Sequence, residues 1–575
     1  MSMIKLTING ESVEVEKGST ILEAAAKLNI KIPTLCHMYM GNDRTRNCKG
    51  TCRVCLVEQE GKNTLIPSCS VEAYDGMAIK TNTPRVVNAR RRMVELILSD
   101  HPQDCLNCKK NTHCELQKLA ADLGITEVRY KGEMSQYPID DSTKVIVRDM
   151  NKCIQCRRCV TMCNEVQKVH ALTMVDRGFE STVSTFFNMP LSGTECTYCG
   201  QCIAVCPTGA LVVSRDYDKV WDVLDDQDKY VVVQTAPAVR VGLGEDFGLP
   251  AGSVTTGKMV AALKKLGFSA VYDTNFAADL TIMEEATEFI DRFTKQENLP
   301  VITSCCPAWV KFAEDTYPEL LNHISTCKSP QQMFGAIAKT YLAKNLNIDP
   351  QNIVVISIMP CTAKKHEATR PEMGRDGIQD VDLVITTREF AKMVKEAGID
   401  LVNIEPKEYD DLLGQSSGAG NLFGATGGVM EAALRTSYEW VTGNALDNVE
   451  FKDVRGLKGI KEATIELSGK EVNVAVASSL GHARKIMDDI KSGISKYDFI
   501  EIMACPGGCI NGAGQPFIKS NFDIVEKRMG GIYTTDSEKT LRKAHENPMI
   551  KKLYDEFLEK PNSEKAHELL HTKFV

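Results

Sequence analysis

Three short apolar runs in the C-terminal two thirds of the chain each end beside a loop that carries cysteine. The runs are residues 299–302, 353–358 and 502–504. Each is typical of a buried strand that delivers a thiol into a loop, with a proline close to the cysteine. The four thiols expected to meet are those of Cys306, Cys361, Cys505 and Cys509. Four thiolates suit a closed iron–sulfur cubane, although a buried free cysteine is also an ordinary core residue.

The same loops resemble the three signature segments of the iron-only ([FeFe]) hydrogenases. The segments are TSCCPAW from Thr303, MPCTAKKHE from Met359 and MACPGGCINGAGQP from Met503. The resemblance runs over essentially the whole chain. It implies an H-cluster: a [4Fe–4S] cubane on the four thiols, bridged by Cys509 to a diiron subsite with CO, CN⁻ and azadithiolate. The reaction implied is the reversible formation of H₂ from two protons and two electrons.

A proton route is also implied by the resemblance. Glu285 and Glu288 are three residues apart in a helix-like segment, so they share a face with Arg292 one turn on. An acidic helix face is more often simply solvated, but Cys305 is a thiol with no cluster to bind beside a cluster ligand. Together with Ser325 these residues match the family's carboxylate–serine–thiol relay.

The walls of the site follow from the same resemblance. Lys364 would bind the distal cyanide by a charge-assisted hydrogen bond. Further pocket positions, which could equally be plain core, are Pro237, Ala238, Gln331, Met359, Phe423 and Met503.

Cys327 departs from the family, which usually has alanine at this position. The segment around it matches one that lines the distal iron, and a soft thiolate within reach of an open iron can ligate it. One hypothesis is therefore that Cys327 closes the site reversibly under oxidising conditions and excludes O₂. The alternative is an inert buried cysteine.

Composition is that of a soluble, multidomain, globular protein. The chain has 575 residues, 43% of them hydrophobic and 25% charged, with a formal net charge of −8. No stretch approaches about 18 uninterrupted apolar residues and the N-terminus lacks a signal-peptide pattern, so we expect a cytoplasmic protein that binds neither membranes nor nucleic acid. Twenty-two cysteines in a reducing compartment indicate metal sites rather than disulfides.

Residues 1–80 are expected to form a β-grasp, plant-type [2Fe–2S] ferredoxin domain. A strand–turn–strand pattern over residues 4–15 and a helix capped near Thr20 precede its thiols. The expected ligands are Cys36, Cys52, Cys55 and Cys69. Cys48 competes with Cys52, which we favour because its segment continues straight into a strand.

Residues 81–130 carry a histidine and three cysteines at spacings seen beside such a domain in hydrogenases and in a complex I subunit. The set is His101, Cys105, Cys108 and Cys114. A [4Fe–4S] cluster is expected, with a structural zinc site as the chemical rival. The nearby basic run at residues 90–92 is more often a solvated helix face than a docking site.

Residues 131–215 contain two copies of the bacterial two-cluster ferredoxin run, in which the fourth cysteine of each run crosses to the other cluster. The first predicted [4Fe–4S] ligand set is Cys153, Cys156, Cys159 and Cys206. The second is Cys163, Cys196, Cys199 and Cys202.

Residues 216–575 read as a large α/β domain with a C-terminal helical segment. Strands are expected near residues 230–234, 301–302, 353–358, 383–385, 472–477 and 499–503. The glycine-rich turn at 424–429 lacks a phosphate loop's Lys-Ser/Thr, so nucleotide binding is rejected. An acidic stretch at 222–228 is expected to be a surface connection, and the last forty or so residues are expected to be charged surface helices.

The sequence therefore predicts a hydrogenase with one [2Fe–2S] cluster, three [4Fe–4S] clusters and the H-cluster. A relay this long implies an external ferredoxin or flavodoxin-type carrier, and the diiron subsite implies maturation proteins. An electron-transfer subunit, an iron–sulfur scaffold and a hydrogen sensor are the alternatives. The first explains only residues 1–215, while the other two have no use for Cys305, Lys364 and the relay. The direction of catalysis and the oligomeric state stay open.

Overall fold

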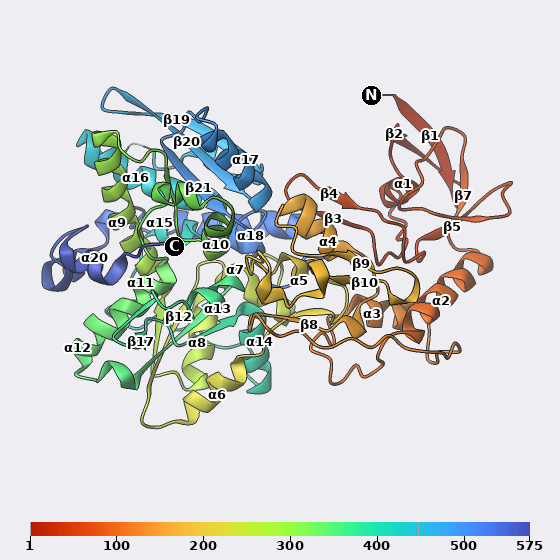
Figure 1. Cartoon of the computed structure of the whole chain (residues 1–575), viewed down its shortest axis with the longest axis horizontal. Coiled ribbons are helices and arrows are strands. Elements are labelled where there is room, and N and C mark those ends of the chain that lie inside the picture. Colours follow the sequence, from red (N-terminus) through yellow and green to blue (C-terminus); the bar gives the residue numbers. More distant parts are fainter. Residues whose placement is uncertain (1, 447, 575) are drawn as a thin grey trace.

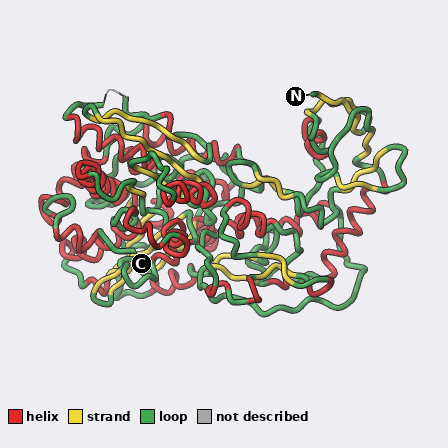
Figure 2. The backbone as a smooth tube through the Cα atoms, turned by 45° about the horizontal axis from the view of Figure 1, so that its top comes forward, coloured by secondary structure: helices red, strands yellow, loops and turns green. Residues whose placement is uncertain are grey.

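The computed structural model describes residues 2–446 and 448–574. Figure 1 shows the N-terminal sheet at one end of the molecule and a large α/β body at the other, with short strands and helices between them. Figure 2 shows how much of that middle part is loop. The expected combination of small cluster domains and a large α/β domain is therefore confirmed.

The N-terminal region is a five-stranded sheet with one helix. The strand order is β2-β1-β7-β5-β6. Asn9 and Gly10, both at positive φ, turn the chain between the two antiparallel strands that open it. A capping box formed by Thr20 and Glu23 starts the helix. The bounds are β1 Met3–Ile8, β2 Glu11–Glu16, α1 Ile21–Lys27, β5 Leu56–Gln59, β6 Leu65–Pro67 and β7 Ala78–Lys80.

Two helices follow, α2 (Pro84–Ser99) and α3 (Glu115–Asp122). The expectation of a solvated basic face on α2 holds for Arg91 and Arg92, which are exposed, but not for Arg90. Arg90 is buried because its guanidinium donates two hydrogen bonds, of 2.8 and 3.1 Å, to the carbonyl oxygen of Leu56 at the start of β5.

The middle region is built around two antiparallel strands and two short helices. β8 (Ile146–Arg148) pairs with β11 (Leu211–Val213). Each cysteine run leads into a helix, α4 (Arg158–Thr161) or α5 (Gln201–Val205). The chain therefore folds back on itself so that the fourth cysteine of each run lies near the other run.

Two four-stranded sheets form the large domain. In the first, order β13-β12-β15-β18, all strands are parallel. In the second, order β14-β21-β20-β19, only the edge strand β19 is antiparallel. The bounds are β12 Tyr230–Thr235, β13 Ala270–Asp273, β14 Val301–Ile302, β15 Ile353–Met359, β18 Leu383–Thr386, β19 Ile460–Leu467, β20 Lys470–Ser478 and β21 Phe499–Met503. All six predicted strands are present.

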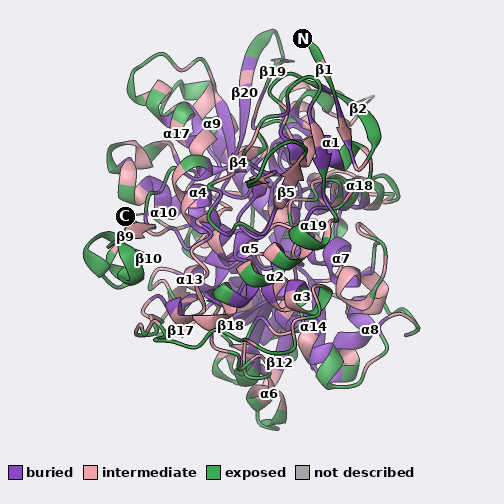
Figure 3. Cartoon of the chain, turned by 90° about the vertical axis from the view of Figure 1, so that its right-hand side faces the viewer, coloured by how far each residue is buried: buried purple, intermediate pink, exposed green. Residues whose placement is uncertain are grey.

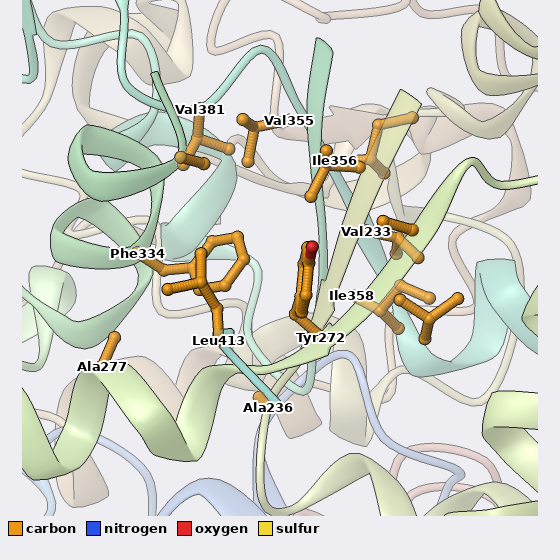
Figure 4. Packing of buried hydrophobic residues seen from close by; sticks show 14 of the residues in the cluster. Val233, Ala236, Tyr272, Ala277, Phe334, Val355, Ile356, Ile358, Val381 and Leu413 are labelled. Atoms are coloured by element: carbon orange, nitrogen blue, oxygen red, sulfur yellow. The ribbon is translucent and has the colours of Figure 1, made fainter. Parts of the chain in front are cut away.

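Helices cover both faces of these sheets, as parallel strands require. Their bounds are α6 Tyr217–Asp225, α8 Thr256–Leu266, α9 Thr274–Lys295, α10 Pro307–Thr316, α11 Pro330–Ile337, α13 Ala363–Glu367, α14 Thr387–Glu396, α15 Gly418–Leu422, α16 Gly428–Thr442, α17 Leu480–Lys491 and α18 Asp523–Ser537. The acidic stretch expected to be a connection is thus partly helix α6. Figure 3 shows the buried residues gathered along strands such as β20, and Figure 4 shows Tyr272 and Phe334 packed with the valines and isoleucines of the first sheet.

The C-terminal segment is docked into the core and is not a set of purely surface helices. It comprises α19 (Pro548–Leu553), a π-helical turn (Tyr554–Leu558) and α20 (Glu564–Leu570). Six apolar residues from these elements join the core of the first sheet: Ile550, Leu553, Leu558, Ala566, Leu569 and Leu570. The expectation is corrected here because apolar residues at helical spacing bury one face while the charged face stays outside. None of the described helices is long and apolar enough to cross a membrane.

Candidate active site and metal centres

The three cysteine loops meet at one cavity because their strands end at neighbouring edges. β14 ends before Cys305 and Cys306, β15 before Cys361, and β21 before Cys505. The thiols of Cys306, Cys361, Cys505 and Cys509 all line a cavity of about 80 Å³. Of the expected pocket residues, Pro237, Gln331, Met359, Phe423 and Met503 line it too. Ala238 is not among the described lining residues; its carbonyl oxygen instead accepts a 2.6 Å hydrogen bond from Gln515.

A glycine-rich turn at residues 424–429 packs against the loop that carries Cys505 and Cys509. Gly427 N and Met430 N donate hydrogen bonds of 2.6 and 2.8 Å to the buried carboxylate of Glu501 on β21. Thr426 N in turn donates to Gly507 O at 3.2 Å. A Cβ at Gly508 would lie 2.8 Å from the Ala425 carbonyl carbon, so the two loops approach as only glycine allows. The sequence gave no sign of the role of Glu501.

The chemistry of the four thiols fits an iron–sulfur cubane. Burial raises the pKa of all four, that of Cys361 to about 12, so these thiols ionise only with a cation among them. Two sulfurs already accept N–H donors, Cys306 from Ala504 N at 3.4 Å and Cys505 from Gln201 Nε2 at 3.1 Å. Such N–H···S contacts are among the protein's means of tuning a cluster.

Three of the predicted relay residues, Arg292, Glu288 and Ser325, are joined by direct contacts. Arg292 Nη2 lies 2.5 Å from Glu288 Oε1, and Ser325 Oγ donates to Glu288 Oε2 at 2.7 Å. Glu285 is fully buried, and within the described residues neither of its carboxyl oxygens has a hydrogen-bond partner. Burial foremost, then the charge of Glu288, raises the pKa of Glu285 to about 8. Cys305 faces the cavity, and burial, followed by the charge of Glu285, raises its pKa well above the ordinary value.

Lys364 lines the cavity and is held by a residue that the sequence reasoning missed. Its Nζ lies 2.9 and 3.1 Å from the carboxylate oxygens of Glu367 and donates to Cys305 O at 3.1 Å. Glu367 also accepts from Ser329 Oγ at 2.9 Å and from Gln331 Nε2 at 3.1 Å. The spacing of three between Lys364 and Glu367 in a helix was the signal available.

Cys327 lies on the relay side of the site. It is fully buried, its Sγ is 4.0 Å from Glu288 Oε2, and its backbone bridges to His571. Among the described residues it is not part of the cavity lining. That Cys327 ligates iron stays a prediction, and the position of its thiol outside the cavity lining does not support it.

Two close pairs of thiols occur in the N-terminal domain. The Sγ atoms of Cys36 and Cys52 are 3.4 Å apart, and those of Cys55 and Cys69 are 3.3 Å apart. Tetrahedral thiolates on one metal ion lie about 3.8 Å apart, so each pair can hold one iron of a [2Fe–2S] cluster. Within the described chain, Cys48 makes no hydrogen bond to any of these thiols. The geometry thus places Cys52, and not Cys48, beside the partner thiol.

The histidine–cysteine set is more widely spread. Burial lowers the pKa of His101 to about 4, and its buried Nδ1 has no partner, which leaves a neutral imidazole free to bind a metal. No three histidine, cysteine or carboxylate ligand atoms of this region lie within 4.8 Å of one another in the described chain. Zinc ligands would be about 3.8 Å apart. The spacing therefore favours a larger group, such as a [4Fe–4S] cluster.

The middle region has two small cavities with crossed cysteine sets. One, of about 10 Å³, is lined by Cys153, Cys156, Cys159 and Cys206. The other, of about 30 Å³, is lined by Cys163, Cys196, Cys199 and Cys202. These are the two sets that the sequence predicts, each with its fourth member from the other run.

Glycines bring neighbouring centres into contact. A Cβ at Gly209 would lie 2.7 Å from Cys108 Sγ, and a Cβ at Gly200 would collide with Thr362 Oγ1 next to Cys361. Cys199 lines both the second ferredoxin cavity and the cavity of the large domain. Neighbouring candidate centres are therefore in close contact at these three points.

Comparison with known proteins now decides the family. The chain is 52% identical over 584 aligned residues to the NADP-reducing hydrogenase subunit HndD of Solidesulfovibrio fructosivorans, covering 100% of this chain and 99% of that one. It is 40% identical to iron hydrogenase 1 of Clostridium pasteurianum over the full length of both. The chain belongs to the iron-only hydrogenase family. It is an [FeFe]-hydrogenase, an oxidoreductase that acts on H₂.

The family models divide this hydrogenase as follows. Residues 229–513 match the C-terminal domain of the iron only hydrogenase large subunit, and residues 522–575 match the iron hydrogenase small subunit. The N-terminal matches are a 2Fe-2S iron-sulfur cluster binding domain (1–84), the NADH-ubiquinone oxidoreductase-G iron-sulfur binding region (90–129) and the ferredoxin-like domain of NADH-quinone oxidoreductase subunit 3 (143–212).

Solved structures resemble the hydrogenase body. The structure describing stepwise assembly of the [FeFe]-hydrogenase H-cluster in HydA(deltaEFG) aligns at 41% identity with a TM-score of 0.56, covering 62% of this chain and 98% of that one. The docked C-terminal segment thus corresponds to what is a small subunit in some relatives.

Proposed function

We propose that this hydrogenase interconverts H₂ with protons and electrons at a diiron H-cluster held by Cys306, Cys361, Cys505 and Cys509. The observation that carries the proposal is the convergence on one cavity of four cysteine thiols, the additional thiol of Cys305 and the ammonium of Lys364. When bound, the H-cluster supplies the iron centre at which protons and electrons combine. The residues of the chain hold it, exclude water and deliver protons.

Proton delivery is assigned to the line Arg292, Glu288, Ser325, Glu285 and Cys305. With a pKa of about 8, Glu285 is mostly protonated at neutral pH and can serve as an internal donor. Arg292 orients the Glu288 side chain by the 2.5 Å ion pair. Lys364, fixed by Glu367, places a positive charge against the cavity where an anionic ligand such as cyanide would lie.

Electrons are assigned to a relay of one [2Fe–2S] and three [4Fe–4S] clusters. The paired thiols of the first domain, the spread histidine–cysteine set and the two crossed sets of the middle region support this count. Cys199, which lines the last relay cavity and the catalytic cavity, is the point of hand-over to the H-cluster. Protection from O₂ by Cys327 forms no part of the proposal.

The external carrier is proposed to be an acidic ferredoxin or flavodoxin. Beside Cys108, Leu106 is 88% exposed, and the adjoining cleft is lined by Lys109, Lys392 and Lys395, none of which has a carboxylate ion pair in the described chain. An exposed apolar side chain ringed by cations is complementary to an acidic carrier. The 52% identical relative, named as an NADP-reducing subunit, favours a second candidate in which a partner subunit passes the electrons to NADP⁺.

Infrared spectroscopy of the anaerobically matured protein tests the proposal. Metal-bound CO and CN⁻, held by metal ions that act as Lewis acids, absorb between roughly 1800 and 2100 cm⁻¹, where protein groups do not absorb. The diiron subsite, whose metal ions bind these ligands, can therefore be detected directly. We expect bands there in the parent and their loss in Cys509→Ser. Silence in matured protein with intact iron–sulfur signals would refute the proposal. Reduction of NADP⁺ by the isolated chain, without a partner subunit, would contradict the second candidate as stated.

A further inference from the structure

The C-terminal segment reaches the proton relay through one histidine. His571 Nδ1 lies 2.8 Å from Thr326 Oγ1, and Thr326 Oγ1 lies 3.4 Å from Glu288 Oε1. The backbone N–H of Thr326 also donates to both Glu288 oxygens at 3.2 Å. Backbone hydrogen bonds from Lys328 N to Leu570 O (2.7 Å) and from Thr572 N to Thr326 O (2.8 Å) fix this geometry on both sides.

The other face of His571 is held by a buried carboxylate. Its Nε2 lies 3.1 Å from Glu284 Oε2. Glu284 is completely buried and also accepts hydrogen bonds from the Tyr554 hydroxyl and from Asn562 N. Three hydrogen bonds therefore hold the Glu284 carboxylate in place, and one of them fixes the Nε2 side of the His571 ring.

A path to solvent begins at a second histidine one helical turn earlier. The rings of His567 and His571 are 4.1 Å apart between centroids, and His567 is exposed while His571 is buried. The hydrogen-bonded line runs from His571 through Thr326 to Glu288, and the exposed His567 touches its outer end by a ring contact. His567 lies on α20 and His571 directly follows that helix, Thr326 lies in the loop before α11, and Glu288 lies on α9.

In the described chain, the proposed relay ends at Arg292, which cannot release a proton. Arg292 contacts Glu288, but a guanidinium is never deprotonated in a protein, so it can orient Glu288 without supplying it. Glu288 is only 8% exposed, which leaves a narrow contact with water there. Imidazole, by contrast, is the side-chain group whose charge ordinarily changes between about pH 5 and 8.

We propose that His571 is a second proton entrance to the relay, acting on Glu288 through Thr326. The inference rests on the proposed function of Glu288. In the forward step the proton on His571 Nδ1 passes to Thr326 Oγ1 while the hydroxyl proton of Thr326 passes to Glu288 Oε1, so one proton moves from imidazolium to carboxylate. The neutral imidazole then regains its proton from water, with which His571 keeps a narrow contact at 7% exposure. No electron moves and no bond other than these O–H and N–H bonds changes.

The titratable groups around His571 and its partners are Glu284 and Glu288 on α9, Tyr554 on the π-helical turn, His567 on α20 and Cys327 in the loop before α11. An imidazole ordinarily changes its charge between about pH 5 and 8. The entrance is therefore expected to be open at about pH 6 and closed at about pH 9.

The test compares four variants of the full, cluster-loaded chain. His571→Gln keeps hydrogen-bonding groups toward Thr326 and Glu284 but carries no proton, and Thr326→Val keeps the shape of the side chain but removes the hydroxyl. We expect each to lower H₂ evolution about tenfold at pH 6 and to match the parent at pH 9. Thr326→Ser should restore the parent's profile. The double variant His571→Gln/Thr326→Val should be no slower than either single one, because both lie on one path.

A second readout does not depend on turnover. The rate at which the buried Glu285 carboxyl exchanges its proton in D₂O, followed by its infrared band, should fall in His571→Gln and Thr326→Val. This measurement decides the inference even if the protein shows no CO or CN⁻ bands, so its failure is distinct from failure of the proposed function. His545→Gln, at a histidine bound to Glu439 and Thr436, is the matched control and should change neither readout.

Three results would overturn the inference. One is a Thr326→Val variant with the parent's pH profile and exchange rate. Another is a double variant in which the two losses multiply. The third is an equal loss at pH 6 and pH 9 in His571→Gln together with a lowered melting temperature, since that pattern marks a purely structural role.

Discussion

Glu285→Gln is the substitution with the most quantitative expectation. The Glu285 carboxyl is fully buried and has no hydrogen-bond partner in the part of the chain that the structure describes. Burial, followed by the charge of Glu288, raises its pKa from 4.5 to about 8. A carboxyl whose folded-state pKa is raised contributes stability that is fully present below the unfolded pKa and is lost as pH rises through the folded pKa. The parent should therefore lose stability between pH 4.5 and 8 on account of this residue, and the neutral glutamine should not.

The size of the effect follows from the shift. A rise from 4.5 to about 8 corresponds to about 5 kcal/mol at about 1.4 kcal/mol per pKa unit. Melting temperatures of parent and Glu285→Gln, measured by scanning fluorimetry at one scan rate, should differ little at pH 5. At pH 9 the variant should melt several degrees higher. Other titrating groups are common to both proteins and cancel in the difference.

The same variant should be nearly inactive. Glutamine can hydrogen bond but cannot carry a proton between Ser325 and Cys305, so H₂ turnover should fall by about 10² or more while CO and CN⁻ bands persist. A melting-temperature gap that is independent of pH would refute the raised pKa. Full turnover would refute the assignment of Glu285 to the relay.

Three further expectations concern other contacts. Glu367→Gln leaves the Lys364 ammonium buried without its counter-charge and should destabilise the chain by about 3 kcal/mol. The melting temperature should fall while the iron content stays unchanged. An unaltered melting temperature would contradict the buried ion pair. Cys48→Ser should retain the electron paramagnetic resonance signal of the [2Fe–2S] cluster and Cys52→Ser should lose it, because only Cys52 is paired with Cys36; the reverse pattern would exchange their roles. Cys327→Ala should lose activity in air at the parent's rate, since its thiol faces Glu288; faster loss would restore the protective role.

Metal ligands were the part of the site most open to prediction from sequence. The crossed sets around Cys163 and Cys206 follow from a spacing rule that leaves no alternative partner in either run. The strands were equally readable, because buried parallel strands are continuous apolar runs such as β15 and β21. Both features depend on local pattern, which the sequence displays directly.

Residues that act by long-range contact escaped the sequence. Glu501 looks like an ordinary polar position in a strand, and its role exists only because the turn at Gly427 folds against it. The docking of residues 548–571 was missed for a related reason. A short amphipathic helix predicts that one face is covered but not by what, so the contact between His571 and Thr326 needed the fold.

The close approach at Gly200 has a consequence for how this enzyme can be rebuilt. Electron tunnelling decays exponentially with distance, and the packing of Gly200 against Thr362 leaves no room for a single added methyl group between the last relay centre and the catalytic loop. The ferredoxin-like part is thus packed tightly against the large domain, and it cannot be exchanged as an independent module. Consider a chimaera that joins foreign cluster domains at a loop without reproducing that glycine contact. It would fold and bind its clusters, but electrons would pass slowly from those domains to the catalytic site.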